Sequence, residues 1–181
     1  MRWFWVDRFT EFVSGSHAKG IKNISLVEEA VDEYCPGYPF LPPTLIIEGM
    51  AQMGGILVAE HFLFDKRVVL AKVGRAVFHA PALTGTTLHY EVRLDAIQDD
   101  GGTVTSTSHC DGVLQAEIDL MFAFLDEGFL VQGPLFDPDD LKGMLQIMKF
   151  FSVAVDANGN RFPTYEKLDA DPVGPSGTDR S

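Results

Sequence analysis

A single carboxylate, Glu48, lies inside an apolar stretch that two prolines introduce, PPTLIIEGMAQMGG from 42 to 55. No lysine or arginine occurs between Lys22 and Lys66, so no basic residue close in sequence can neutralise this acid. Burying an unpaired acid is costly, and acids in such surroundings cluster at functional sites. Glu48 is therefore the first candidate for proton transfer, and the alternative is a structural acid near a helix start.

Few side chains near Glu48 in the sequence could share a proton with it. No histidine occurs between Glu33 and Gly55. Cys35 needs a nearby base to become a nucleophile, and since none is visible we expect it to fill space. Gln52 follows one turn later on the same helix face, which predicts a hydrogen-bonding neighbour rather than a catalyst. The five histidines show no spacing typical of a metal site, so we expect no metal ion and no cofactor.

Composition restricts the partners and the compartment. The 181 residues carry a net charge of −12, which argues against nucleic acid and against anionic membranes as partners. The two cysteines form no disulfide or metal pattern, as expected in a reducing compartment. No apolar run reaches the roughly 18 residues that a membrane span needs, and the N-terminal apolar stretch is too short for a signal peptide. The sequence therefore predicts a cytoplasmic protein.

The segment around Glu48 is predicted to form a long buried helix. Proline is tolerated at the first helical position, so the double proline at 42–43 marks its start, and nothing except glycine interrupts it until about Phe64. Its apolar residues cover almost every direction, which is typical of a helix buried on all sides. It contains three glycines, Gly49, Gly54 and Gly55. Each lowers helix propensity by about 1 kcal/mol, which indicates that another backbone passes close by.

Alternating apolar and polar residues predict an antiparallel sheet around this helix. Between Thr87 and Ile97 the apolar residues fall at every second position, the period of a strand with one buried face. Turns at 99–102 and 111–112 separate this segment from two further strands. The predicted strands lie at 3–13, 17–24, 68–78, 87–97, 103–110 and 114–124. The fold class is therefore α+β, an antiparallel sheet of five or six strands wrapped around a long central helix.

The remainder of the chain differs in character from this first domain at 1–125. Asp137 and Pro138 are typical of a helix start, and an apolar stripe follows at Leu141, Met144, Leu145, Met148 and Phe151. We expect a C-terminal extension with a short amphipathic helix at 126–155. The segment 156–181 is rich in Asp, Pro, Gly, Asn and Ser, which predicts a flexible or weakly docked tail.

Three segments together resemble a known family. They are VDRFTEF at 6–12, YCPGYPFLPPTLIIEGMAQMGG at 34–55 and FHAPALTGTTL at 78–88. In this order they resemble the β-hydroxyacyl-[acyl-carrier-protein] dehydratase family, which has the hotdog fold, over roughly residues 1 to 125. The resemblance implies a dimer whose two central helices lie within one continuous sheet. It also implies an acyl chain that enters a tunnel between the subunits on a phosphopantetheine thioester.

The same resemblance implies roles for individual residues. In the family, a histidine of one subunit and a carboxylate of the other remove water from a 3-hydroxyacyl thioester, giving a trans-2-enoyl product. The acid position falls on Glu48, and the histidine position falls on Tyr34. Tyr34 and Glu48 are therefore the expected catalytic residues. The residues expected to bind substrate are Phe40, Pro43, Thr44 and Gln52.

Two positions depart from the family pattern in ways that bear on chemistry. A tyrosine, with a pKa near 10, is a poor base at neutral pH. It could instead stack on an acyl chain, bind Glu48 across a dimer or donate a proton, and a loop aromatic that fills the old site is the structural alternative. Pro43 replaces the glycine whose N–H binds the thioester carbonyl, and proline has no N–H. Losing one such donor typically costs about 2.7–4 kcal/mol of transition-state stabilisation.

The interpretation is a dehydratase-like protein that acts on or binds 3-hydroxyacyl or enoyl thioesters of acyl carrier protein or coenzyme A, in fatty-acid or polyketide-type metabolism. One alternative is a hotdog thioesterase that uses Glu48 alone. Another is an acyl-binding protein without activity, and a third is a heterodimer in which a homologue supplies the histidine. We expect a dimer of either kind, or a higher oligomer. Four basic residues are candidates for docking an acidic carrier protein or a coenzyme A phosphate: Lys66, Arg67, Lys72 and Arg75.

Overall fold

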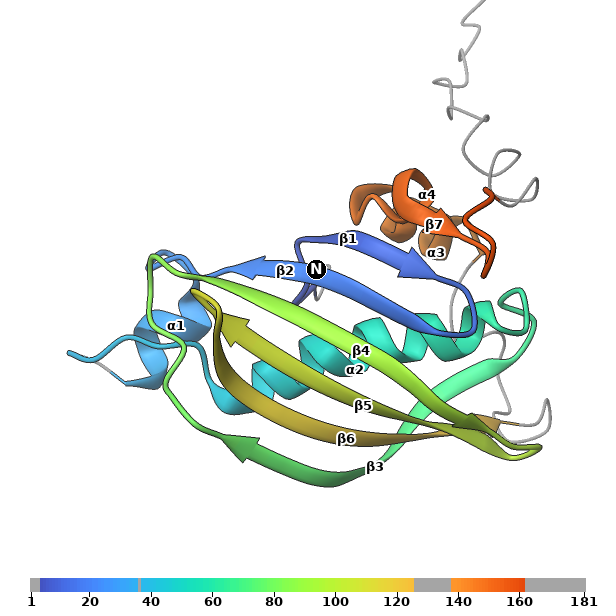
Figure 1. The fold of residues 1–181 in the computed structure, drawn as a ribbon. Helices are drawn as coiled ribbons and strands as arrows, with labels where there is room; N and C mark the ends of the chain where they lie inside the picture. Colours follow the sequence, from blue (N-terminus) through green and yellow to red (C-terminus); the bar gives the residue numbers. More distant parts are fainter. Residues whose placement is uncertain (1–3, 36, 126–137, 162–181) are drawn as a thin grey trace, which may run out of the picture.

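A curved sheet wraps around one long helix in the computed structural model, which describes residues 4–35, 37–125 and 138–161 (Figure 1). The strands are β1 (Arg8–Val13), β2 (His17–Asn23), β3 (Arg67–Phe78), β4 (Thr87–Ile97), β5 (Gly101–Cys110), β6 (Val113–Leu125) and β7 (Ala154–Val155). Their order in the sheet is β3-β6-β5-β4-β2-β1-β7. The α+β architecture predicted from the sequence is confirmed. The sheet has seven strands rather than five or six, because the C-terminal extension adds β7.

The central helix α2 (Pro43–Glu60) begins at the predicted proline, and ten of its 18 residues are buried. A Cβ atom at Gly49 would lie 2.6 Å from the carbonyl oxygen of Trp5. The prediction that another backbone passes close to the helix is therefore confirmed at this glycine. The helix ends at Glu60 rather than near Phe64, because Leu63 and Phe64 take positive φ angles of 54° and 63°.

The buried face of the sheet follows the predicted alternation over most of its length. On β4, Leu88, Tyr90 and Val92 are buried beneath α2. The alternation fails at the end of β4, where Leu94 is half-buried and Ala96 is exposed. The pairing register of β4 and β5 shifts between these two residues, and such a bulge re-aims the side chains that follow it.

The C-terminal extension closes one edge of the sheet. It consists of α3 (Pro138–Ile147), α4 (Phe150–Val153) and β7, which pairs parallel with β1 through Phe12 and Ala154. The residues of the predicted stripe that are fully buried are Leu145, Met148 and Phe151. The predicted helix start at Asp137 and the tail beyond 161 lie outside the described residues.

Aromatic rings join the extension to the rest of the core. The ring centroid of Phe150 lies 5.9 Å from Phe9, 4.6 Å from Phe12 and 6.1 Å from Phe64. Such edge-to-face pairs stabilise a core beyond the area that they bury. Phe64 belongs to the positive-φ turn after α2, so the extension also packs against the end of the central helix.

Phe150→Ala will lower the free energy of unfolding by about 3–5 kcal/mol, because it leaves a cavity among buried aromatic rings. Urea denaturation followed by circular dichroism measures the change. Ile147→Ala in the same extension is the control, since Ile147 is 49% exposed and should cost under about 1 kcal/mol. A loss for Phe150→Ala no larger than for Ile147→Ala would show that the extension does not share the core of the domain.

The opposite edge of the sheet is open. In the described part of the chain, β3 pairs only with β6. Two apolar residues of this strand are partly exposed, Leu70 at 40% and Val73 at 38%. An open apolar edge is a template for pairing with another chain.

A short helix that the sequence did not indicate, α1 (Glu29–Tyr34), precedes α2. No helix among the described residues is long and apolar enough to cross a membrane.

Candidate functional site

Glu48 lies in the second turn of α2 and is partly buried. Gln52 Nε2 donates a hydrogen bond to Glu48 Oε1 at 3.2 Å, so the two side chains are neighbours as predicted. The backbone N–H of Trp5 donates to Gln52 Oε1 at 2.9 Å. A backbone N–H can only donate, so this bond turns the NH₂ group of Gln52 toward the carboxylate. The N-terminal segment thereby holds the amide that orients Glu48.

The close approach of Trp5 depends on the residue next to Glu48. Gly49 has no side chain, and a Cβ atom there would meet the Trp5 carbonyl oxygen at 2.6 Å. The other oxygen of the carboxylate, Oε2, takes part in no hydrogen bond or ion pair within the ranges that the structure describes. One oxygen of the Glu48 carboxylate is thus held by Gln52.

Tyr34 ends α1 and points partly into solvent, with 55% of the residue exposed. Its ring meets the ring of Phe40 edge-on at 5.3 Å. Phe40 is tied to the segment after β3 by a β-bridge to Leu83, and the N–H of Leu41 donates to the carbonyl of Ala82 at 2.8 Å. Phe40 and Leu41 are therefore held in place just before the start of the central helix.

The structure brings the predicted site residues together in two groups. Glu48 and Gln52 form one group on α2, and Tyr34 at the end of α1 forms the other with Phe40, which precedes α2. No hydrogen bond joins Tyr34 to Glu48 within one chain. Pro43 and Thr44 occupy the first turn of α2, where Thr44 is exposed.

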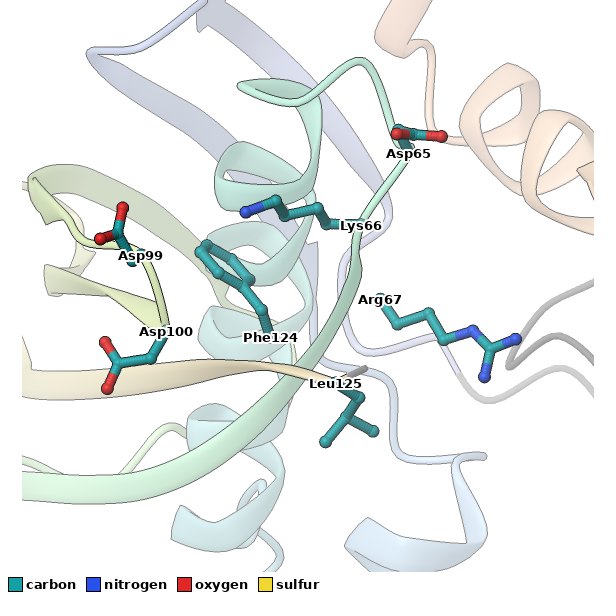
Figure 2. A pocket seen from close by; sticks show the side chains of 7 residues that line it. All are labelled: Asp65, Lys66, Arg67, Asp99, Asp100, Phe124 and Leu125. Atoms are coloured by element: carbon teal, nitrogen blue, oxygen red, sulfur yellow. The ribbon is translucent and has the colours of Figure 1, made fainter. Parts of the chain in front are cut away.

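The candidate docking residues Lys66 and Arg67 lie at the far end of α2, beside a hollow of about 410 Å³ (Figure 2). The Lys66 ammonium sits 4.3 Å from the ring centre of Phe62 and 4.6 Å from that of Phe124. Three carboxylates line the same hollow, Asp65, Asp99 and Asp100. This end of the molecule therefore combines both signs of charge.

The other two candidate docking residues lie further along β3. Arg75 contacts Glu117 at 3.4 Å, and His79 contacts the same carboxylate at 3.0 Å. These bonds, with His79 the larger cause, hold the pKa of Glu117 below its usual range. Lys72 is exposed. Arg67 and Arg75 are eight positions apart on β3, about 26 Å at the rise of a strand, so the four basic residues do not form one compact patch.

Sequence reasoning missed the contribution of Trp5. The aromatic N-terminus was expected to form a strand, whereas β1 starts only at Arg8. The contact that matters is a backbone donor 47 residues away from Gln52, and backbone donors leave no sequence signal. Both cysteines are free, and no group of three His, Cys, Asp or Glu residues in the described ranges is arranged to hold a metal ion.

Comparison with known proteins shows the family to which this chain belongs. The model of the FabA-like domain matches residues 3–119. The chain belongs to the FabA-like family. Similar FabA-like proteins include the 3-hydroxyacyl-[acyl-carrier-protein] dehydratase FabZ of Thermomicrobium roseum, 37% identical over 67% of this chain and 82% of that protein. The FabZ of Fusobacterium nucleatum is 35% identical over 67% of this chain and 86% of its own length.

Solved structures confirm the hotdog fold of this FabA-like chain. The dehydratase heterocomplex ApeI:P from Xenorhabdus doucetiae matches with a TM-score of 0.58 and 15% identity, over 79% of this chain and 90% of that one. The structure of smu.793 from Streptococcus mutans, bound to acetyl CoA, matches with a TM-score of 0.55 and 13% identity, over 65% and 87%. The FabA-like match ends at residue 119, so α3, α4 and β7 lie beyond it.

Proposed function

We propose that this protein is a dehydratase of 3-hydroxyacyl thioesters carried by acyl carrier protein, with Glu48 as its carboxylate. The observation that carries the proposal is the oriented carboxylate on α2, at the position where the family has its catalytic acid. The similar FabZ proteins are dehydratases of such substrates by name. The chain covers 82% and 86% of their lengths.

The roles of the two catalytic groups follow from their chemistry. Elimination breaks the α C–H bond and the β C–O bond, forms the C=C bond and releases water. A phenol carries an O–H that it can donate, so Tyr34 is suited to donate a proton to the departing hydroxyl. The Glu48 carboxylate is then the group that accepts the α proton. Transfer of that proton from Glu48 back to the Tyr34 phenolate resets the site.

Two chains are required to complete this site. No hydrogen bond joins Tyr34 to Glu48 within one chain, while β3 offers an open edge with the partly exposed Leu70 and Val73. A dimer that pairs the β3 edges would cover this apolar surface and bring a second set of site residues next to the first. We therefore assign Tyr34 of one subunit and Glu48 of the other to each site.

A second candidate is a heterodimer with a homologue that supplies a histidine opposite Glu48. The observation in its favour is the tyrosine at position 34, where the family has its base. Under this alternative the purified chain alone is inactive and gains activity only with the partner.

The carrier protein is expected to approach the end of β3 that lies near Tyr34. Arg75 and His79 share Glu117 at that end, and the segment after them contacts the Phe40 loop. Lys72 is exposed on the same strand. We assign Lys72 and Arg75 to carrier docking, whereas Lys66 and Arg67 lie at the distant, acidic hollow.

The assay that tests the proposal uses the purified chain and a 3-hydroxyacyl thioester on acyl carrier protein, with the coenzyme A thioester in parallel. We expect enoyl thioester to form, detected by its absorbance, and faster with acyl carrier protein. Tight acyl binding without turnover would favour the non-catalytic alternative. Release of free thiol without enoyl product would favour the thioesterase.

Gln52→Leu and Gln52→Glu will each lower kcat by about 10–100-fold with little change in KM, because a hydrogen bond to a charged group is lost. Leucine removes both hydrogen bonds of the Gln52 side chain, the one from the Trp5 N–H and the one to Glu48. Glutamate keeps an acceptor for the Trp5 N–H but places a second negative charge one turn from Glu48. Amide hydrogen exchange at Trp5 separates the two variants, since protection should fall only for leucine. Unchanged kcat in both variants would mean that Gln52 does not position the carboxylate.

A further inference from the structure

A second hollow, of about 570 Å³, lies where the outer face of the sheet meets the C-terminal extension. Its walls come from β1, β2, β4 and the turn between α3 and α4, and it faces away from the Glu48 side of the sheet. Residues that line it include Arg8, Asn23, Thr87, His89, Ile147 and Lys149. The wall with Ile147 and Lys149 lies beyond the FabA-like match, which ends at residue 119.

A hydrogen-bonded floor gives the hollow a fixed shape. Asp7 Oδ2 accepts the backbone N–H and the side-chain NH₂ of Asn23, both at 2.7 Å. The hydroxyl of Thr87 donates to Asn23 Oδ1 at 2.7 Å. The remaining oxygen of Asp7 lies 3.7 Å from the buried ammonium of Lys22, which also binds Glu28 at 2.8 Å. The side chains of Asn23, Thr87 and Asp7 in this floor therefore already have hydrogen-bond or ion-pair partners within the chain.

The cationic side chains at the rim, Arg8 and Lys149, differ from the residues of the floor. Arg8 and Lys149 form no ion pair with any residue that the structure describes, and His89 forms no hydrogen bond there. The two cations line the same hollow in a chain with a net charge of −12. Arg8, Lys149 and Lys22 together with Asp7 and Glu28 give these groups a sum of one positive charge.

The backbone at Lys149 supports a specific role for this side chain. Lys149 has φ 60° and ψ 21°, the left-handed region that favours glycine or asparagine. Hydrogen bonds hold it there, because the hydroxyl of Ser152 donates to its carbonyl at 2.7 Å and the N–H of Phe9 donates to the carbonyl of Met148 at 2.8 Å. Residues held in such a conformation cluster at functional sites, and here the held residue directs a cation into the hollow.

We propose that this hollow binds a small organic phosphate between Arg8 and Lys149. The free donors, an arginine fork and an ammonium from separate elements, match the several oxygens of a phosphate better than the two of a carboxylate. The hollow is larger than a phosphate ion needs. The half-buried Ile21 and the half-exposed Ile147 offer apolar surface to an organic group.

Nuclear magnetic resonance titration of the full chain with butyl phosphate, and separately with inorganic phosphate, tests the proposal. We expect the signals of Ile147, Lys149 and His89 to shift, with tighter binding of butyl phosphate than of inorganic phosphate. Arg8→Gln and Lys149→Gln should each weaken butyl phosphate binding by about 10-fold or more, since each removes a charge-assisted hydrogen bond. Lys142→Gln on α3 is the matched control and should leave it unchanged.

Lys149→Gly separates binding from folding, because it should raise Tm by relieving the left-handed backbone while it weakens binding as Lys149→Gln does. Equal affinity for inorganic phosphate would overturn the organic part of the proposal. No shift of the hollow's signals, or unchanged affinity in both Arg8→Gln and Lys149→Gln, would overturn it altogether. None of these results depends on turnover of a thioester.

Discussion

Glu48→Gln will lower kcat for 3-hydroxyacyl thioester dehydration by about 10²–10⁴-fold, the usual contribution of a general acid or base. The amide has nearly the shape of the carboxylate but cannot accept the α proton. Since Gln52 Nε2 donates to Glu48 Oε1, the new side chain can keep that bond through its own oxygen. We therefore expect KM and Tm to change little. Steady-state kinetics and thermal melting measure both.

Asp95→Asn is the matched control for this substitution. Asp95 is exposed on β4, away from α2, and accepts a hydrogen bond from Thr105 at 3.1 Å. It undergoes the same change from acid to amide and should keep kcat within about twofold of the original chain, as expected for a surface change. A Glu48→Gln variant as active as Asp95→Asn would remove Glu48 from the mechanism.

Tyr34→Phe will lower kcat by about 10²-fold or more, because it removes the proton that the departing hydroxyl needs. The ring remains, so the edge-on contact with Phe40 remains as well. Tyr90→Phe is the matched control, because the Tyr90 hydroxyl is buried beneath α2 and has no hydrogen-bond partner in the described ranges. Burial also raises the pKa of Tyr90. Full activity in Tyr34→Phe would show that this residue only packs or stacks.

Tyr34→His tests the direction of proton transfer. Imidazole has a pKa of about 6.5, so it titrates within the range of the assay. If the group at position 34 donates a proton, only the imidazolium works, and kcat of the variant should fall as pH rises through about 6.5. The original chain should show no such loss. A rise in kcat over the same range would mean that position 34 acts as the base and Glu48 handles the hydroxyl.

The sequence predicted the central helix and most of the sheet because both follow local rules. Proline at the first turn and apolar residues on all sides predict α2, and the period of two predicts β4 as far as Val92. The C-terminal end of α2 depends on Leu63 and Phe64, whose positive φ angles no local preference indicates. Their conformation is compatible with packing against Phe150, a contact that is distant in the sequence.

The sequence predicted which residues form the candidate site, but not the contacts that hold their side chains in place. Glu48 and Gln52 follow from an acid in an apolar run and from helical spacing. Gly49 predicted that some backbone passes close to the helix. That this backbone is Trp5, and that its N–H donates to Gln52, arises from a tertiary contact that no pattern within either segment predicts. β7 contributes two residues to the sheet, too few for any periodic signal.

Mixing the two inactive variants tests most directly the claim that each site combines Tyr34 of one chain with Glu48 of another. Equal amounts of Glu48→Gln and Tyr34→Phe are co-expressed and purified together, and kcat is compared with each variant alone. Random pairing gives mixed dimers in about half of the molecules, each with one intact site, so activity should return to about a quarter of the original. A mixture no more active than its components would contradict the shared site.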